Sequence, residues 1–410
     1  MARSSGWNLI AAVIAGVVLV ALLFISLPRE RVNTRGQQCA ARLRNIAFAA
    51  IQHDSSHTYL PGYIKDFGIY SGEESNRSAA SNRGVARHKK LGTWAVTLLA
   101  WLDAQVTYEH WTQDRYPIIL ADSRNILADS RNQQQLESTV GTRGSGFYPL
   151  ATPNLSIFQC PSRPVNVSQN APNSMVYNNG LAWPADRPAS GRTPNINDGV
   201  GNNKYNITKI DPVTGEGIHT GESANIGLDD LADGKSCTIL FSENIQALPW
   251  HRVGLIDSTD LVMKAPNHKD VRFNLEMPKA LAAQYTQGMV WHYEDSDAAN
   301  LKLARQWNKL GGTTPARPHH VAPIHRINGC RNGNRESLFN LRMENAVAAA
   351  DLARPSSAHT SGVNAAFADG STRFITENID YRVYQALMTP RGNKSSVPYP
   401  RFVLPAQFRK

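Results

Sequence analysis

The sequence has few cysteines, and no two of them lie close together. Cys39, Cys160, Cys237 and Cys330 are its four cysteines, and none belongs to a C-x-x-C pair. The closely spaced cysteines of zinc ribbons and thioredoxin-like redox centres are therefore missing, so we expect no metal site. Four separated cysteines fit two disulfides in an exported domain, with three possible connectivities, and they equally fit four buried thiols.

The sequence also lacks any concentrated run of basic residues. Its formal net charge is +10 and its pI is near 9.5, but the arginines are spread along the chain. Without a Lys/Arg block or alternating basic and aromatic residues, we expect no nucleic-acid partner. A basic surface facing acidic polymers or an anionic envelope fits better. The 41% hydrophobic content supports a real core, and 29 glycines and 23 prolines indicate many loops.

Motifs that would place a nucleophile beside a base are missing as well. His319, His320 and His325 have no acidic or cysteine partners at ligand spacing, so they are interpreted as ordinary loop histidines. His359 and Asp369 lie in one stretch, but no motif places a nucleophile or a second carboxylate with them. We therefore expect no catalytic residue and no cofactor.

The stretch around Asp369 is instead typical of a β-hairpin. Val363, Ala365 and Phe367 alternate with other residues, and Asp369-Gly370 follows them. Asp-Gly between alternating apolar stretches favours a type I′ turn, in which both central residues have positive φ. Turn chemistry therefore explains Asp369, and His359 is interpreted as structural.

The N-terminal region contains the longest apolar run. Leu9–Leu27 is 19 residues without a charge, which would span ~28 Å as a helix. It predicts a transmembrane helix, with Trp7 near an interface. A cleaved signal peptide is the alternative, although its apolar run is usually shorter, and the residues after Pro28 are a poor cleavage context. Orientation stays open, because Arg3 precedes the run and three arginines follow it.

Two further helices are expected from apolar periodicity. Beyond a proline kink at Pro28, an apolar stripe at helical spacing predicts an amphipathic continuation that must bury against something; its members are Leu43, Ile46, Ala47, Ala50 and Ile51. Repetition every four residues predicts a second, packed helix; its members are Trp94, Leu98, Leu102 and Val106.

In six ordered blocks the chain resembles DUF1559, a family of prepilin-like proteins of planctomycete-type bacteria. His359, nine residues and then Asp369-Gly370 match the family's H-X9-DG motif. The other matching stretches are GWNLIAAVIAGVVLVALLFISLP, QCAARLRNIAFAAIQHDSSHTYLPGY, TWAVTLLAWLDAQVTYEHW, FQCPS and LADGKSCTILFSEN, the last with Asp233-Gly234.

The resemblance implies a prepilin-type N-terminus in which Gly6 is the last leader residue. The chain departs from that pattern at Ser5, where a basic residue is usual, and at Ala11, where a glutamate is usual. Leader processing and fibre formation therefore stay open. An exported head would oxidise Cys39 with Cys160 or another pair.

These observations predict an α+β fold. A pilin-like N-terminal helix, half transmembrane and half amphipathic, packs on an antiparallel sheet with large loop-rich insertions. The expected domains are a leader-like segment (1–5), a transmembrane helix (6–28), its amphipathic continuation (29–57) and a head (58–410), with insertions near 191–221 and 253–351.

The expected function is that of a non-enzymatic, pilin- or pseudopilin-like envelope protein. It would be anchored in the cytoplasmic membrane by one helix and present an extracytoplasmic head to pilin-like subunits, other envelope proteins or surface polymers. One alternative is an anchored solute-binding module with its ligand among the insertions. The other is an envelope hydrolase that uses His359 or the loop histidines.

Overall fold

The computed structural model describes most of the chain, with gaps. The described residues are 4–71, 85, 87–120, 146–163, 171–182, 196–205, 207–210, 217–219, 225–256, 258–261, 282–292, 322–329, 339–397 and 402–408. Side chains are not described for 4–11, 17–33, 207–210, 217–219 and 259–260.

Helices and strands mix along the chain. The α-helices are α1 (Ser4–His57), α2 (Trp94–Leu98), α3 (Gln105–Thr112), α7 (Ala283–Thr286), α10 (Ala346–Leu352) and α11 (Tyr381–Met388). The strands are β1 (Ile64–Tyr70), β2 (His88–Thr93), β3 (Met175–Leu181), β4 (Ile207–Ile210), β5 (Gly217–His219), β6 (Ile239–Glu243), β7 (Gly288–Trp291), β8 (Gly362–Phe367) and β9 (Thr372–Thr376).

Short 3₁₀ helices join these elements. They are η3 (Leu99–Trp101), η4 (Ser156–Phe158), η6 (Ile196–Asp198), η7 (Leu228–Asp230), η8 (Lys235–Cys237), η9 (Ser258–Leu261), η11 (Pro323–His325), η12 (Gly392–Lys394) and η13 (Ala406–Phe408).

A five-stranded sheet with the order β7-β3-β6-β8-β9 forms the centre of the head. Strands β3, β6, β8 and β9 pair antiparallel, but β7 pairs parallel to β3, so the expectation of a purely antiparallel sheet is wrong. Strand β7 comes from within residues 253–351, which the sequence analysis assigned to an insertion. Two further two-stranded sheets pair β1 with β2 and β4 with β5.

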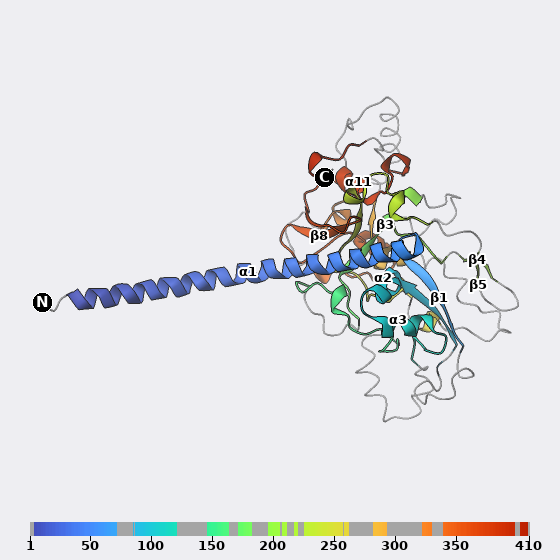
Figure 1. Ribbon diagram of the computed structural model, residues 1–410, viewed down its shortest axis with the longest axis horizontal. Coiled ribbons are helices and arrows are strands. Elements are labelled where there is room, and N and C mark those ends of the chain that lie inside the picture. The colour runs from blue at the N-terminus through green and yellow to red at the C-terminus, as the bar shows by residue number, and fades with distance from the viewer. Residues whose placement is uncertain are drawn as a thin grey trace, which may run out of the picture.

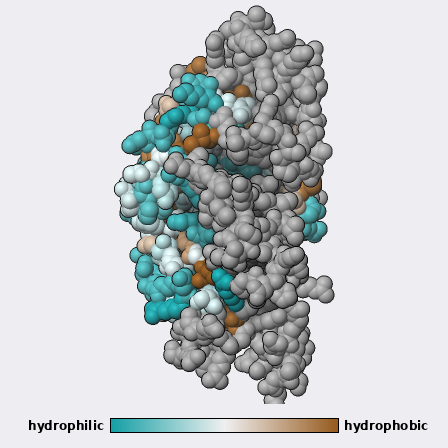
Figure 2. Space-filling model, turned by 90° about the vertical axis from the view of Figure 1, so that its right-hand side faces the viewer, coloured by the Kyte–Doolittle hydropathy of each residue, from teal (hydrophilic) through white to brown (hydrophobic). Residues whose placement is uncertain are grey.

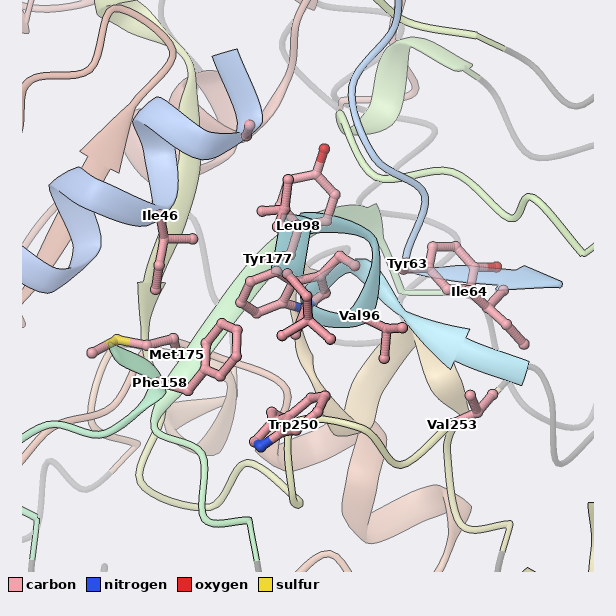
Figure 3. Packing of buried hydrophobic residues seen from close by; sticks show 14 of the residues in the cluster. Ile46, Tyr63, Ile64, Val96, Leu98, Phe158, Met175, Tyr177, Trp250 and Val253 are labelled. Atoms are coloured by element: carbon pink, nitrogen blue, oxygen red, sulfur yellow. The ribbon is translucent and has the colours of Figure 1, made fainter. Parts of the chain in front are cut away.

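Helix α1 is one continuous element that passes through position 28 without a break. Figure 1 shows that its N-terminal part extends away from the head, while its C-terminal part lies across the sheet. That C-terminal part buries Leu43, Ile46, Ala47 and Ala50 completely. In Figure 3, Ile46 lies above Met175 of β3, and Tyr177, Phe158 and Trp250 continue the same apolar cluster.

The two faces of the central sheet are covered by different helices. Strand β8 turns Asn364 and Ala366 toward α1, and it turns Val363, Ala365 and Phe367 toward α11. This alternation follows from the two-residue period of a strand. We call the surface that carries Asn364 and Ala366 the α1 face, and the surface that carries Val363, Ala365 and Phe367 the α11 face.

The transmembrane half of the expected fold is wrong. Within the part of the chain that the structure describes, no helix has the length and apolar character needed to cross a bilayer. A spanning helix needs about 20 predominantly apolar residues. In residues 34–57 of α1, whose side chains are described, Arg35, Arg42 and Arg44 lie outside the buried apolar stripe, so this part of the helix is amphipathic.

The second expected helix is also not continuous. The stretch that was expected to form one helix through Val106 divides into α2, η3 and α3. Asp103 adopts a left-handed φ of 55°, which ends the helical path between η3 and α3. Because α3 then starts in a new direction, Val106 is 71% exposed instead of packed.

The described surface of the head is mainly polar on the side shown in Figure 2. Its hydrophobic residues form small, separate patches among hydrophilic ones. Scattered apolar residues of this kind are normal on a protein surface. The described part of this side therefore offers no large apolar contact area.

Candidate functional site

The two ends of the H-X9-DG motif contact the same helix. A Cβ built on Gly36 of α1 would lie 3.8 Å from Nδ1 of His359, so the imidazole packs against this turn of the helix. At the other end, a Cβ built on Gly370 would lie 2.8 Å from Cε1 of Phe48. Between them, the amide of Asn364 donates a hydrogen bond to the carbonyl of Gly36 at 3.4 Å.

The motif therefore follows the axis of α1 from Gly36 to Phe48. Twelve residues of helix rise about 18 Å. The six residues of β8, which lie between His359 and Asp369, extend about 20 Å. Because these lengths are similar, the two ends of the motif reach two separate turns of α1. His359 and Asp369 stand at opposite ends of the strand, so they do not form a hydrogen-bonded pair.

The turn after β8 has one more residue than a type I′ turn. Phe367 donates its N–H to the carbonyl of Ser371 at 2.9 Å, and Gly370 donates to the carbonyl of Phe367 at 2.9 Å. Gly370 has a φ of 80°, whereas Asp369 does not have a positive φ. This is a three-residue loop that ends in a left-handed glycine, so the type I′ expectation is wrong. Asp369 accepts the N–H of Ser371 at 2.8 Å, as Asx turns do.

The histidine end of the motif contains a compact group of polar side chains. Cys39 of α1 forms a disulfide with Cys160, which fixes the helix covalently to the head. Nε2 of His359 lies 2.9 Å from Oε1 of Glu243 and 3.5 Å from Sγ of Cys160. All four residues are buried. We call Cys39, Cys160, Glu243 and His359 the disulfide cluster.

The backbone and neighbouring side chains position the members of the disulfide cluster. Oε2 of Glu243, at the end of β6, accepts the backbone N–H of Asn364 at 2.8 Å and its side-chain amide at 3.3 Å. The backbone N–H of His359 donates a hydrogen bond to Oγ of Ser357, and this hydroxyl donates one to the carbonyl of Gly362. A buried carboxylate needs such partners to offset its lost hydration.

The arrangement does not form a nucleophile–base relay. In such a relay, one ring nitrogen of a histidine faces the nucleophile and the other faces an orienting carboxylate. Here the same nitrogen, Nε2, faces both Glu243 and Cys160. Cys160 is disulfide-bonded and has no thiol proton, and Nε2, which donates to Glu243, has no free lone pair to accept one. The cluster instead connects α1, β6 and the segment before β8.

The structure also places side chains that the sequence analysis did not single out. Glu243 lies inside a matched block, LADGKSCTILFSEN, but nothing near it in the sequence indicates that His359 is its partner. Its position at the end of a fully buried strand is the available signal, because a carboxylate there requires a partner. Asn364 was missed for a similar reason, since its bonds reach α1 and β6.

Asp233 and Gly234 lie elsewhere, near the C-terminal end of α11. Gly234 has a φ of 102° and starts η8, and Asp233 accepts the N–H of Gly392 at 2.6 Å. Burial raises the pKa of the Asp233 carboxyl. With Arg382, Gln385 and other residues, Asp233 lines a cavity of about 280 Å³. The structure does not bring this turn to the disulfide cluster.

The remaining expected positions are not brought to the cluster. Gly6 lies within α1, and His319 and His320 are outside the described residues. His325 stacks on His292 and lies 3.0 Å from a carboxylate oxygen of Asp351. Burial, with a smaller contribution from His325, lowers the pKa of His292 to about 3.

The fold and the cluster together describe a mixed-sheet α+β head with a long N-terminal helix fixed to it by a disulfide. A family model described as a protein of unknown function (DUF1559), SBP_bac_10, matches residues 29–382. This match covers more than half of the chain, so the protein belongs to the DUF1559 family. The match confirms the resemblance inferred from the H-X9-DG motif and its accompanying blocks. No curated protein and no solved structure matches the chain.

Proposed function

We propose that this protein is a non-enzymatic, pilin- or pseudopilin-like envelope component that presents an extracytoplasmic head to a second copy of itself or to other envelope proteins. The observation that carries the proposal is the division of α1 into two parts. One part is fixed to the head by a buried disulfide, and the other extends from the head. An extended helix on a rigid head is suited to side-by-side packing with the same helix of another subunit.

The disulfide supports an extracytoplasmic head. Disulfides persist in oxidising compartments and are rare where thioredoxin and glutathione keep thiols reduced. The bond between Cys39 and Cys160 is buried in the core between α1 and the segment after η4. The orientation of His359 supports a structural role for the motif, because its Nε2 faces both Glu243 and Cys160.

Site-specific photocrosslinking tests assembly through α1. A photoreactive benzoylphenylalanine replaces Val13, which is 59% exposed on the extending part of α1. In native cells we expect a covalent dimer of this chain on irradiation. The matched control replaces Val106, which is 71% exposed on α3 and lies on the head. If Val13 gives no more dimer than Val106, assembly through α1 is wrong.

A second candidate function is the binding of a small solute, favoured by the cavity near α11. Its volume of about 280 Å³ approaches the lower end of the range for small-molecule sites. The walls combine the Asp233 carboxyl, Arg382 and Gln385 with apolar Phe402 and Leu404. A solute that binds there raises the melting temperature of the native protein, and Gln385→Ala should abolish that rise. A screen of small polar solutes without any such shift would exclude this candidate.

A further inference from the structure

The four side chains of the disulfide cluster are all of types that bind metal ions. One ligand atom from each of Cys39, Cys160, Glu243 and His359 lies within 4.8 Å of every other. Two thiolates, an imidazole and a carboxylate are ligands that zinc takes in four-coordinate sites. Because the sequence has no C-x-x-C pair, no metal site was expected, but the fold brings these four side chains together from distant positions.

The spacing of these groups is compatible with one tetrahedral ion. Zinc bonds are about 2.3 Å to sulfur and about 2.0 Å to nitrogen or oxygen, so neighbouring ligand atoms lie roughly 3.3–3.8 Å apart. Sγ of Cys160 already lies 3.5 Å from Nε2 of His359, and Nε2 lies 2.9 Å from Oε1 of Glu243. The Cα atoms of Cys39 and Cys160 are 5.2 Å apart, which lets both sulfurs reach one ion.

The surroundings also resemble the outer shell of a metal site. Asn364 binds Oε2 of Glu243 through its backbone N–H and its amide, which leaves Oε1 directed at His359. Ser357 binds the backbone of His359. Outer-shell hydrogen bonds of this kind orient metal ligands. Burial of the whole cluster excludes water and makes an unpaired thiolate unfavourable, so a cation would offset the charge of a reduced pair.

We propose that the reduced protein binds one zinc ion through Cys39, Cys160, Glu243 and His359, and that disulfide formation and zinc binding exclude each other. A dithiol that reaches the extracytoplasmic head reduces the disulfide: two electrons and two protons pass to the cysteines, and the dithiol becomes a disulfide. Zinc then displaces both thiol protons into the solvent, and the neutral imidazole of His359 moves its proton from Nε2 to Nδ1, which leaves the Nε2 lone pair to bind the ion. Oxidation by an acceptor disulfide reverses the exchange and releases the ion, because the sulfurs then bind each other.

Metal titration of the full chain tests this proposal. Cys237→Ser and Cys330→Ser are combined, so that Cys39 and Cys160 are the remaining cysteines of the sequence. Protein reduced with a phosphine, then desalted without oxygen, is titrated with Zn²⁺ against a chromophoric chelator. We expect one equivalent per reduced chain and none per oxidised chain. Cobalt should give thiolate-to-metal charge-transfer absorption in the reduced chain alone.

Ligand variants define the site. Glu243→Gln and His359→Gln should each weaken zinc binding at least about tenfold. The matched control is His325→Gln, which removes the histidine of the His325–Asp351 pair. This pair lies outside the disulfide cluster, so the control should bind zinc with full affinity. Unchanged zinc affinity in both ligand variants would overturn the assignment. Equal zinc uptake by the oxidised and the reduced protein would also overturn it.

The proposal remains testable if the variants do not fold. The reduced protein with wild-type ligands is then melted with and without one equivalent of Zn²⁺. Zinc should raise its melting temperature, or restore its near-ultraviolet circular dichroism if the reduced chain unfolds without metal, because zinc binds the folded ligand set. Zinc should not change the melting temperature of the oxidised protein. A reduced chain that takes up no zinc and gains no stability from it would refute the proposal.

Discussion

The two faces of the central sheet are stabilised by different kinds of contact. On the α1 face, a disulfide, a buried histidine–glutamate pair and a close glycine contact fix a long helix to the sheet. On the α11 face, a short amphipathic helix buries Tyr384, Leu387 and Met388 against strand residues, without a covalent bond between them. Both helices bury apolar side chains, but α1 is also held by a covalent bond and a buried histidine–glutamate pair, whereas α11 adds hydrogen bonds such as those of Tyr384 and Gln385.

The largest effect should come from the covalent contact on the α1 face. Replacing both cysteines, Cys39→Ala with Cys160→Ala, frees a loop with a sequence separation of 121 residues. Restored chain entropy should lower the free energy of unfolding by about 5 kcal/mol, as measured by urea titration. The control Cys237→Ala replaces a cysteine outside the disulfide, and it should lower the free energy of unfolding far less. Equal losses would mean that the disulfide adds nothing to the α1 face.

A somewhat smaller loss should follow from a cavity on the α11 face. Leu387 is fully buried in the apolar cluster under α11. Leu387→Ala should lower the free energy of unfolding by about 3 kcal/mol, because it removes apolar contacts and leaves a void. Thermal and urea unfolding measure it. Val347→Ala, at a 61% exposed site on α10, should change stability little, and a similar loss there would contradict the apolar account.

The close contact between Gly370 and Phe48 can be measured by a double-mutant cycle. Gly370→Ala should cost about 2 kcal/mol, since a Cβ there meets the phenyl ring and the φ of 80° disfavours alanine. In a Phe48→Ala background the ring is gone, and the loss should fall to about 1 kcal/mol. An identical loss of stability in both backgrounds would show that glycine is needed at position 370 only for its positive φ, and not for the close contact with Phe48 of α1.

The last effect concerns a carboxyl near the α11 face and depends on pH. Asp198 is buried; Oδ1 accepts the N–H of Ser396, whereas Oδ2 lacks a partner among the described residues. Burial raises the pKa of Asp198 to about 6, so ionisation costs stability as pH rises from about 4 through 6. Asp198→Asn should therefore stabilise the protein at pH 7.5, by about 3 kcal/mol at most, and have little effect at pH 4.

Melting curves at the two pH values measure this difference. Glu243 provides the comparison, because its carboxylate accepts three hydrogen bonds from His359 and Asn364. Glu243→Gln should destabilise at pH 7.5, opposite in sign to Asp198→Asn. If both substitutions destabilise at pH 7.5, the two carboxylates do not differ as their hydrogen bonds indicate.

The sequence predicted best those elements whose apolar residues repeat over a short distance. The apolar stripe on α1 and the alternation in β8 follow from local periodicity of the sequence. The break between η3 and α3 was not predictable in this way. Asp103 in a left-handed conformation redirects the chain while the four-residue repeat continues to Val106.

Elements defined by distant partners could not be read from the sequence. Strand β7 has four residues and pairs parallel with β3, whose nearest end lies more than 100 positions earlier, so no local pattern marks it. The site shows the same limit. The motif identified His359 and Gly370 as structural residues, but Glu243 became the neighbour of His359 only through the pairing of β6 with β8.

The position of α1 on the sheet has a consequence for biosynthesis. The helix leaves the ribosome first, but β8 and β9, on which it lies, follow about 300 residues later. At roughly 5–20 residues per second, the apolar stripe of α1 waits tens of seconds for its binding surface. The contacts of α1 with α2, η4 and β6 can form earlier, because these elements precede β8 in the chain. The contacts of α1 with β8 and β9 are therefore among the last of the head to form during synthesis.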